Sequence, residues 1–149
     1  KQNKGATVLG VTEKTLRDHY QIRAVLEGYA CVLCVETGAD LSALQNCLKV
    51  SEEMVASGDS SRYSDMNQSF HYEIWNASGN EKLVTMLSEL WNGLSMGVQT
   101  TEMEYAKKSF AEHKKIYEAI AAKDAETARA QMEKHIRRSL EDMLTRYRE

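Results

Sequence analysis

Proline is absent from all 149 residues of the chain. Helical periodicity is therefore interrupted by glycines and capping residues alone, and these fall at intervals typical of helix ends. No run of alternating β-branched residues indicates a strand. Short loops between successive helices favour antiparallel neighbours, so the sequence predicts an all-α fold, an antiparallel bundle of about six to seven helices.

Long apolar runs and an excess of positive charge are also missing. No stretch approaches the roughly 20 apolar residues that a membrane span needs, and no signal-peptide pattern opens the chain. We therefore expect a cytoplasmic protein without a membrane partner. The net charge of −3 provides no basic surface for a phosphate backbone, so the chain is a poor candidate for binding DNA by itself.

Cysteine is scarce, and three residues are too few and too unevenly paired for a disulfide framework. Cys31 and Cys34 form a C-x-x-C pattern, but they lie in an apolar, helical stretch with no preceding strand. No second pair of this kind completes a zinc site. We expect both to be buried structural thiols.

Six helices are expected, over residues 12–37, 40–58, 61–77, 80 to about 94, 109–122 and from 124 into the charged end. Their expected caps are Gly38, Asp40, Asn80 and Asp124. Ser109 and Glu112 have the spacing of a capping box, which places the start of the fifth helix at Ser109 and leaves residues 97–108 unassigned. The first helix is expected to face the core with its apolar side, which is formed by Leu16, Tyr20, Val25, Leu26, Tyr29 and Leu33.

Three of the four histidines occupy positions that favour a shared site. His71 follows Asn67 by four residues, so both side chains lie on one helix face. An antiparallel pairing of the last two helices could bring His113 and His135 toward one interior point. Three imidazoles with an amide or carboxylate oxygen suit zinc, nickel or manganese, although buried histidines with purely structural roles remain the alternative. His19 is expected on a solvated face.

Three stretches together resemble the FadR-type C-terminal effector domain (FCD domain) of the GntR transcription regulators. Residues 20–27 (YQIRAVLE) are similar to that family's opening pattern of an aromatic residue, an arginine and Leu-Glu. Residues 67–71 (NQSFH) and 77–80 (ASGN) are similar to its D-x-x-F-H motif and the following turn. The third stretch, from Glu112-His113 to His135-Ile136, is similar to its closing helix pair. The resemblance covers nearly all of the chain from about Thr12.

The resemblance implies a divalent metal bound inside the bundle by Asn67, His71, His113 and His135. It also implies that Arg23 binds the carboxylate of a small organic acid, for which a planar guanidinium is well suited. Asn67 departs from the family's aspartate and brings no negative charge. This departure implies either a weaker metal site that the acid helps to complete, or a metal-free pocket in which the histidines serve as hydrogen-bond partners.

The resemblance divides the chain into two parts. Residues 1–11 are expected to be a remnant of a winged-helix domain or its linker, because residues 4–8 (KGATV) resemble that domain's last strand. Residues 12–149 are expected to form the effector-binding domain. DNA contact is expected only through a winged-helix domain absent from this chain. A homodimer is expected, in which Trp91, Met96 and Met103 serve either the dimer surface or the core.

Two other functions compete with a ligand-sensing, non-enzymatic domain. Three histidines around a metal with an open position could activate water, which is the basis of a metal-dependent enzyme. Against this, no general base has a defined place near the site, and none of the histidines has a glutamate three residues before it. A purely structural dimerisation module would make the histidines incidental.

Overall fold

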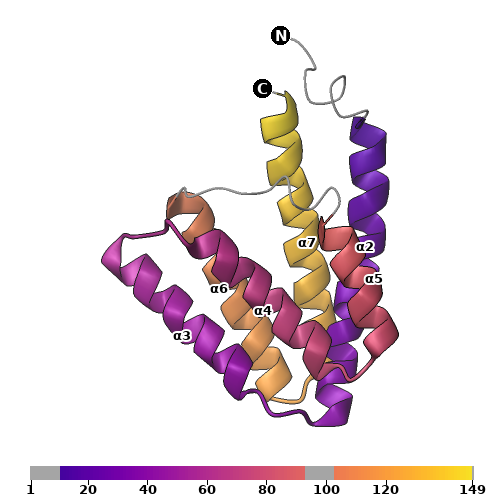
Figure 1. Ribbon diagram of the computed structural model, residues 1–149, viewed down its shortest axis with the longest axis vertical. Coiled ribbons are helices and arrows are strands. Elements are labelled where there is room, and N and C mark those ends of the chain that lie inside the picture. Colours follow the sequence, from indigo (N-terminus) through magenta and orange to yellow (C-terminus); the bar gives the residue numbers. More distant parts are fainter. Residues whose placement is uncertain (1–10, 93–102, 149) are drawn as a thin grey trace.

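The computed structural model describes residues 11–92 and 103–148, with side chains described as far as residue 145 (Figure 1). All regular structure in these ranges is helical, which confirms the predicted all-α bundle. The helices are α2 (Glu13–Thr37), α3 (Ser42–Ser57), α4 (Tyr63–Ala77), α5 (Glu81–Asn92), α6 (Met103–Ala121) and α7 (Ala125–Arg148). None of them has the length and apolar character needed to cross a bilayer.

The two longest helices, α2 and α7, pack along each other, as Figure 1 shows. Gly28 permits their close approach, because a Cβ atom there would meet Cγ of Arg129 at 3.0 Å. Helix α4 contacts α2, α3, α5 and α6, while α6 packs against α7. The core therefore lies where α4 meets the α2, α6 and α7 helices, and Phe70, Ile116 and Ile136 are buried there.

Most helix ends fall where the capping residues predict them. Gly38 ends α2 in the left-handed conformation with φ of 64°, which glycine adopts without the steric cost of a Cβ atom. The side chains of Asn80 and Asp124 accept hydrogen bonds from backbone amides three residues later, at 3.0 and 3.1 Å. Asp40 differs from the prediction, because it accepts a bond from the Ser42 amide and α3 begins at Ser42.

The predicted start of α6 is wrong. The helix begins at Met103, six residues before Ser109, so Ser109 lies inside the helix and caps nothing. Tyr105 and Ala106 explain the extension, because they are buried against Tyr63 in a small second cluster. This contact spans a long stretch of sequence, and the local capping pattern at Ser109 carries no information about it.

The buried face of α2 also differs from the prediction. Val25 and Tyr29 are exposed, at 60% and 49%, although both were expected on the apolar side. The face that turns inward includes Arg23 and Glu27, which are buried. The expected interior role of the C-x-x-C pair is confirmed, because Cys31 and Cys34 are both buried free thiols.

Candidate metal centre

Three helices from distant parts of the sequence bring His71, His113 and His135 together. His71 comes from α4, His113 from α6 and His135 from α7. One ring nitrogen of each lies within 4.8 Å of the corresponding nitrogens of the other two. All three side chains are buried, with at most 2% of each residue exposed. The bundle therefore holds a group of three imidazoles that could bind a metal ion.

A glutamate fixes the orientation of His135. Oε1 of Glu112 lies 2.5 Å from Nδ1 of His135, and Oε2 accepts a hydrogen bond from Nε of Arg138. Burial raises the pKa of Glu112, but hydrogen bonds from His135 and Arg138 and the positive charge of Arg138 outweigh burial and lower that pKa overall. The carboxylate is therefore ionised and accepts the Nδ1 hydrogen of His135, which leaves the lone pair of His135 on Nε2.

Glu27 holds His71 in the same way from α2. Oε1 of Glu27 lies 2.9 Å from Nδ1 of His71 and accepts a bond of 2.7 Å from Nε1 of Trp75. Its other oxygen accepts a bond of 2.8 Å from Nε of Arg23. Burial raises the pKa of Glu27, yet the charges of His71 and Arg23 and the bonds from His71 and Trp75 bring it down to about 2. His71 and His135 thus each pair Nδ1 with a carboxylate, which leaves Nε2 available for a metal. Metal-binding histidines commonly have such a carboxylate partner.

His113 completes the group and is held by its surroundings. Its ring stacks on Phe70 with centroids 3.9 Å apart, and its Nε2 lies 3.2 Å from Nε2 of His135. Because Nε2 of His135 carries a lone pair, Nε2 of His113 must donate the hydrogen between them. Burial is the main cause that lowers the pKa of both rings, to about 4 for His135 and well below the ordinary value for His113. Both imidazoles are therefore neutral near pH 7, the form that coordinates a metal.

Two buried polar atoms on α4 have no hydrogen-bond partner among the described residues. They are Nε2 of His71 and Oδ1 of Asn67, which lies one helical turn before His71 on α4. An unpaired buried acceptor costs about 1–3 kcal/mol. A metal ion bound to Nε2 of His71 would satisfy that nitrogen, and an amide oxygen such as Oδ1 of Asn67 is also a suitable metal ligand. Nε2 of His113 and Nε2 of His135 lie 3.2 Å apart. Two nitrogens bound to one tetrahedral zinc, with Zn–N bonds of about 2.0–2.1 Å, would lie roughly 3.3 Å apart, which is close to this distance.

Arg23 lies beside this cluster and is almost fully buried. Its guanidinium carbon lies 4.7 Å from the centre of the Trp91 ring, and its Nε bonds to Glu27. The salt bridge with Glu27 that the i, i+4 spacing allows is therefore present, but it is buried rather than at the surface. His19 is half-buried on α2 and is not part of the three-histidine group.

Four residues that contact the histidines are not predicted as site residues by the sequence: Glu27, Glu112, Ser109 and Trp91. The sequence carries a weak signal for two of them, since Glu27 follows Arg23 by four residues and Glu112 directly precedes His113. For Trp91 the sequence predicts a place either in a dimer surface or in the core, and the structure buries it against His71 with ring centroids 5.3 Å apart. Met103 is partly buried beside Tyr63, and Met96 lies outside the described residues.

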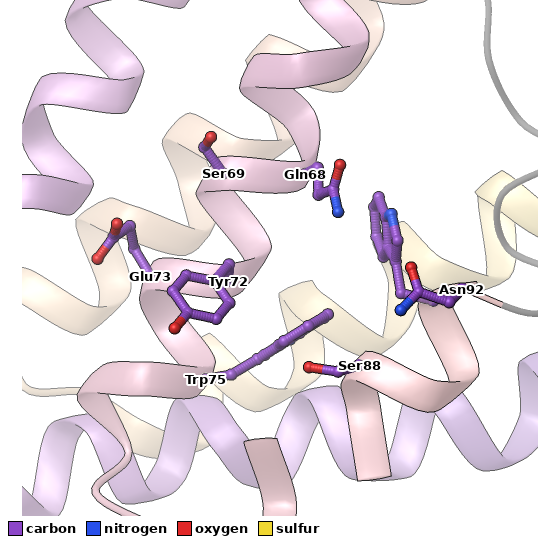
Figure 2. A pocket seen from close by; sticks show the side chains of 8 residues that line it. Gln68, Ser69, Tyr72, Glu73, Trp75, Ser88 and Asn92 are labelled. Carbon is purple, nitrogen blue, oxygen red and sulfur yellow. The ribbon is translucent and has the colours of Figure 1, made fainter. Parts of the chain in front are cut away.

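A pocket of about 330 Å³ opens between α4 and α5, close to the cluster. Figure 2 shows its side chains, with Gln68, Tyr72 and Glu73 on α4 and Ser88 on α5. Trp75 and Trp91 border the pocket and also contact the cluster, Trp75 through Glu27 and Trp91 through His71. Trp75 and Trp91 therefore lie between this pocket and the three histidines.

Comparisons with known proteins agree with this architecture. The chain is 29% identical over 155 residues to the HTH-type transcriptional regulator LutR of Bacillus subtilis (strain 168), an alignment that covers 95% of this chain and 68% of LutR. E. coli McbR/YncC has the same fold, with a TM-score of 0.78, 24% identity and coverage of 92% of this chain and 68% of McbR/YncC. The metal-free FCD domain of TM0439 has a TM-score of 0.73 and 20% identity over 87% of this chain and 91% of its own. The FCD domain family matches residues 18–138, and the chain therefore belongs to the FCD domain family of GntR-type transcription regulators.

Proposed function

We propose that this domain senses a small organic acid at or beside a divalent metal held by His71, His113, His135 and Asn67. The general role of the domain, as the effector domain of a transcription regulator, follows from membership of the family. Binding of the acid favours one conformation of the domain and so changes how an attached winged-helix domain meets DNA. A coupling of about 1–3 kcal/mol between the two sites is sufficient for such regulation.

One observation carries the metal proposal. Nε2 of His71 is buried and has no hydrogen-bond partner among the described residues, and His71 belongs to a group of three histidines whose ring nitrogens, one from each, lie within 4.8 Å of one another. A purely structural histidine would pair both ring nitrogens or expose one to water. Here Glu27 takes Nδ1 and nothing in the described chain takes Nε2.

The ligand set favours a borderline metal. Three imidazoles suit zinc and nickel, and manganese also accepts nitrogen and oxygen ligands. Asn67 contributes a neutral oxygen, so the ion keeps more of its positive charge than it would beside an aspartate. That charge favours an acid as a further partner, which joins the metal and the effector in one site.

Arg23 is proposed to contribute to acid binding from its place beside Glu27. A planar guanidinium can bind a carboxylate through two parallel hydrogen bonds, and the Trp91 ring lies next to it, 4.7 Å from the guanidinium carbon. The pocket between α4 and α5 provides the route by which a small acid reaches this wall of the cluster. Movement of the Trp91 side chain would join the pocket to the histidines.

Calorimetric titration of the metal-stripped protein with Zn²⁺, Ni²⁺ and Mn²⁺ tests the metal proposal. We expect one ion per chain and a higher melting temperature, because a ligand that binds the folded state alone stabilises it. His113→Ala should abolish both effects, whereas His19→Ala, the matched control outside the cluster, should retain them. Equal behaviour of the two variants would contradict the proposal.

Incubation of the metal-loaded protein with small acids separates the competing functions. An acid that binds and is recovered unchanged supports a sensor, and an acid that is converted supports an enzyme.

We also propose a homodimer, as expected for regulators that bind two-fold DNA sites. Sedimentation at micromolar concentration should show it, and a monomer at all concentrations would count against pairing through this domain.

A further inference from the structure

The hydroxyl of Ser109 lies buried at the edge of the three-histidine group. Its Oγ accepts a hydrogen bond of 2.9 Å from Tyr63 and lies 3.4 Å from Nε2 of His113. Ser109 and Tyr63 have no exposed surface. Because α6 begins six residues earlier, helix capping does not explain a serine at this position.

A count of hydrogens shows that Ser109 has one left to donate. The Tyr63 hydroxyl donates to Ser109, so the hydrogen of Ser109 itself needs an acceptor. Nε2 of His113 does not serve when Glu112 holds the Nδ1 hydrogen of His135, because Nε2 of His113 then carries the hydrogen that lies between it and Nε2 of His135. With a metal bound, the lone pair of that nitrogen is already in use.

The backbone is the usual alternative acceptor for a serine or threonine inside a helix. Thr85 and Thr145 follow this pattern and bond to the carbonyl oxygens four residues earlier, at 3.2 and 3.0 Å. No such bond from Ser109 is found among the described contacts. Its hydroxyl instead lies next to His113, in a cluster where Nε2 of His71 also lacks a partner.

We propose that Ser109 donates its hydroxyl hydrogen to a carboxylate oxygen of the small acid that binds beside the three histidines. Tyr63 restricts the direction of that hydrogen, because its own bond occupies one lone pair of Oγ. A carboxylate is an acceptor only, and its charge makes such a bond stronger than a neutral one. The proposal rests on the proposed function and adds a specificity residue on α6 to it.

The test measures metal and acid binding separately in the same protein. Wild-type domain loaded with Zn²⁺ is titrated with acetate, succinate and citrate, and the tightest of the three is used for the variants. Ser109→Ala should retain wild-type zinc affinity and weaken acid binding by about 10-fold or more, as expected for a lost bond to a charged group. Tyr63→Phe keeps the serine hydroxyl but frees it to rotate, and should weaken acid binding less.

Ser51→Ala is the matched control, since Ser51 is a buried serine on α3 outside the cluster. It should bind both zinc and the acid as the wild type does. Equal acid affinity of Ser109→Ala and Ser51→Ala would overturn the proposal, as would a zinc-loaded wild type that binds none of the three acids. Failure of the wild type to bind zinc would instead contradict the metal site itself.

Discussion

Nε2 of His113 lies 3.2 Å from Nε2 of His135, although the two residues are 22 positions apart. The antiparallel packing of α6 on α7 creates this contact. Two neutral imidazoles can share one hydrogen at that distance, so this contact does not require either ring to be charged. A metal ion would replace the shared hydrogen and use the lone pairs of both rings, with a change of tautomer at His113.

Glu112→Gln should weaken zinc binding by about 10- to 100-fold, because the variant no longer holds His135 with a charged acceptor. Calorimetric titration with Zn²⁺ measures the change. Glu118→Gln is the matched control, since Glu118 is an exposed residue of the same helix, and it should bind zinc normally. Wild-type affinity in Glu112→Gln would show that the carboxylate does not position His135.

Asn67→Asp should have opposite effects on the two states of the protein. A carboxylate adds negative charge to the proposed site and favours a hard cation, so Mn²⁺ affinity should rise. Without metal, the same buried charge has no partner, and the melting temperature should fall. Thermal unfolding with and without Mn²⁺ measures both changes, and a melting temperature that does not respond to Mn²⁺ would remove Asn67 from the site.

The metal-free domain should lose stability as the pH falls from about 6.5 toward 4. The folded pKa of His135 is about 4 and that of His113 is well below its ordinary value, mainly because both rings are buried. The unfolded chain therefore takes up protons below about pH 6.5 that the folded chain does not, which favours unfolding. Urea denaturation at several pH values measures this slope. A His113→Gln, His135→Gln double variant should show a smaller slope, and an equal slope would contradict the assignment.

Arg23→Ala should destabilise the domain by about 3 kcal/mol or more, because it removes one partner of a buried ion pair and leaves Glu27 charged in the core. It should also weaken binding of the acid in the zinc-loaded protein. Urea denaturation and calorimetry measure the two effects. Lys14→Ala is the control, since its i, i+4 pair with Asp18 is exposed and should contribute little. If Arg23→Ala behaves as Lys14→Ala does, Arg23 has neither role.

The helical fold could be predicted because helix caps and apolar spacing are local patterns in the sequence. The three histidines could be predicted because they occur in motifs whose order along the chain resembles that of the family. Glycines and caps mark most helix ends, and the D-x-x-F-H resemblance locates His71. The carboxylates behind the histidines were missed because their partners are distant in sequence, 44 positions for Glu27 and 23 for Glu112. On α2, the apolar Val25 and Tyr29 face outward while Arg23 and Glu27 face inward, so hydrophobicity alone gave the wrong face.

The central claim is that His71, His113 and His135 together bind one divalent metal through Nε2. Nitrogen-15 NMR of the histidine rings during a Zn²⁺ titration tests it directly, because the shift of each ring nitrogen reports its hydrogen or its metal. We predict that Nε2 of all three rings changes together and saturates at one ion per chain, with Nδ1 of His71 and His135 still protonated. If fewer than three Nε2 signals respond, or if His19 responds in their place, the shared site is wrong.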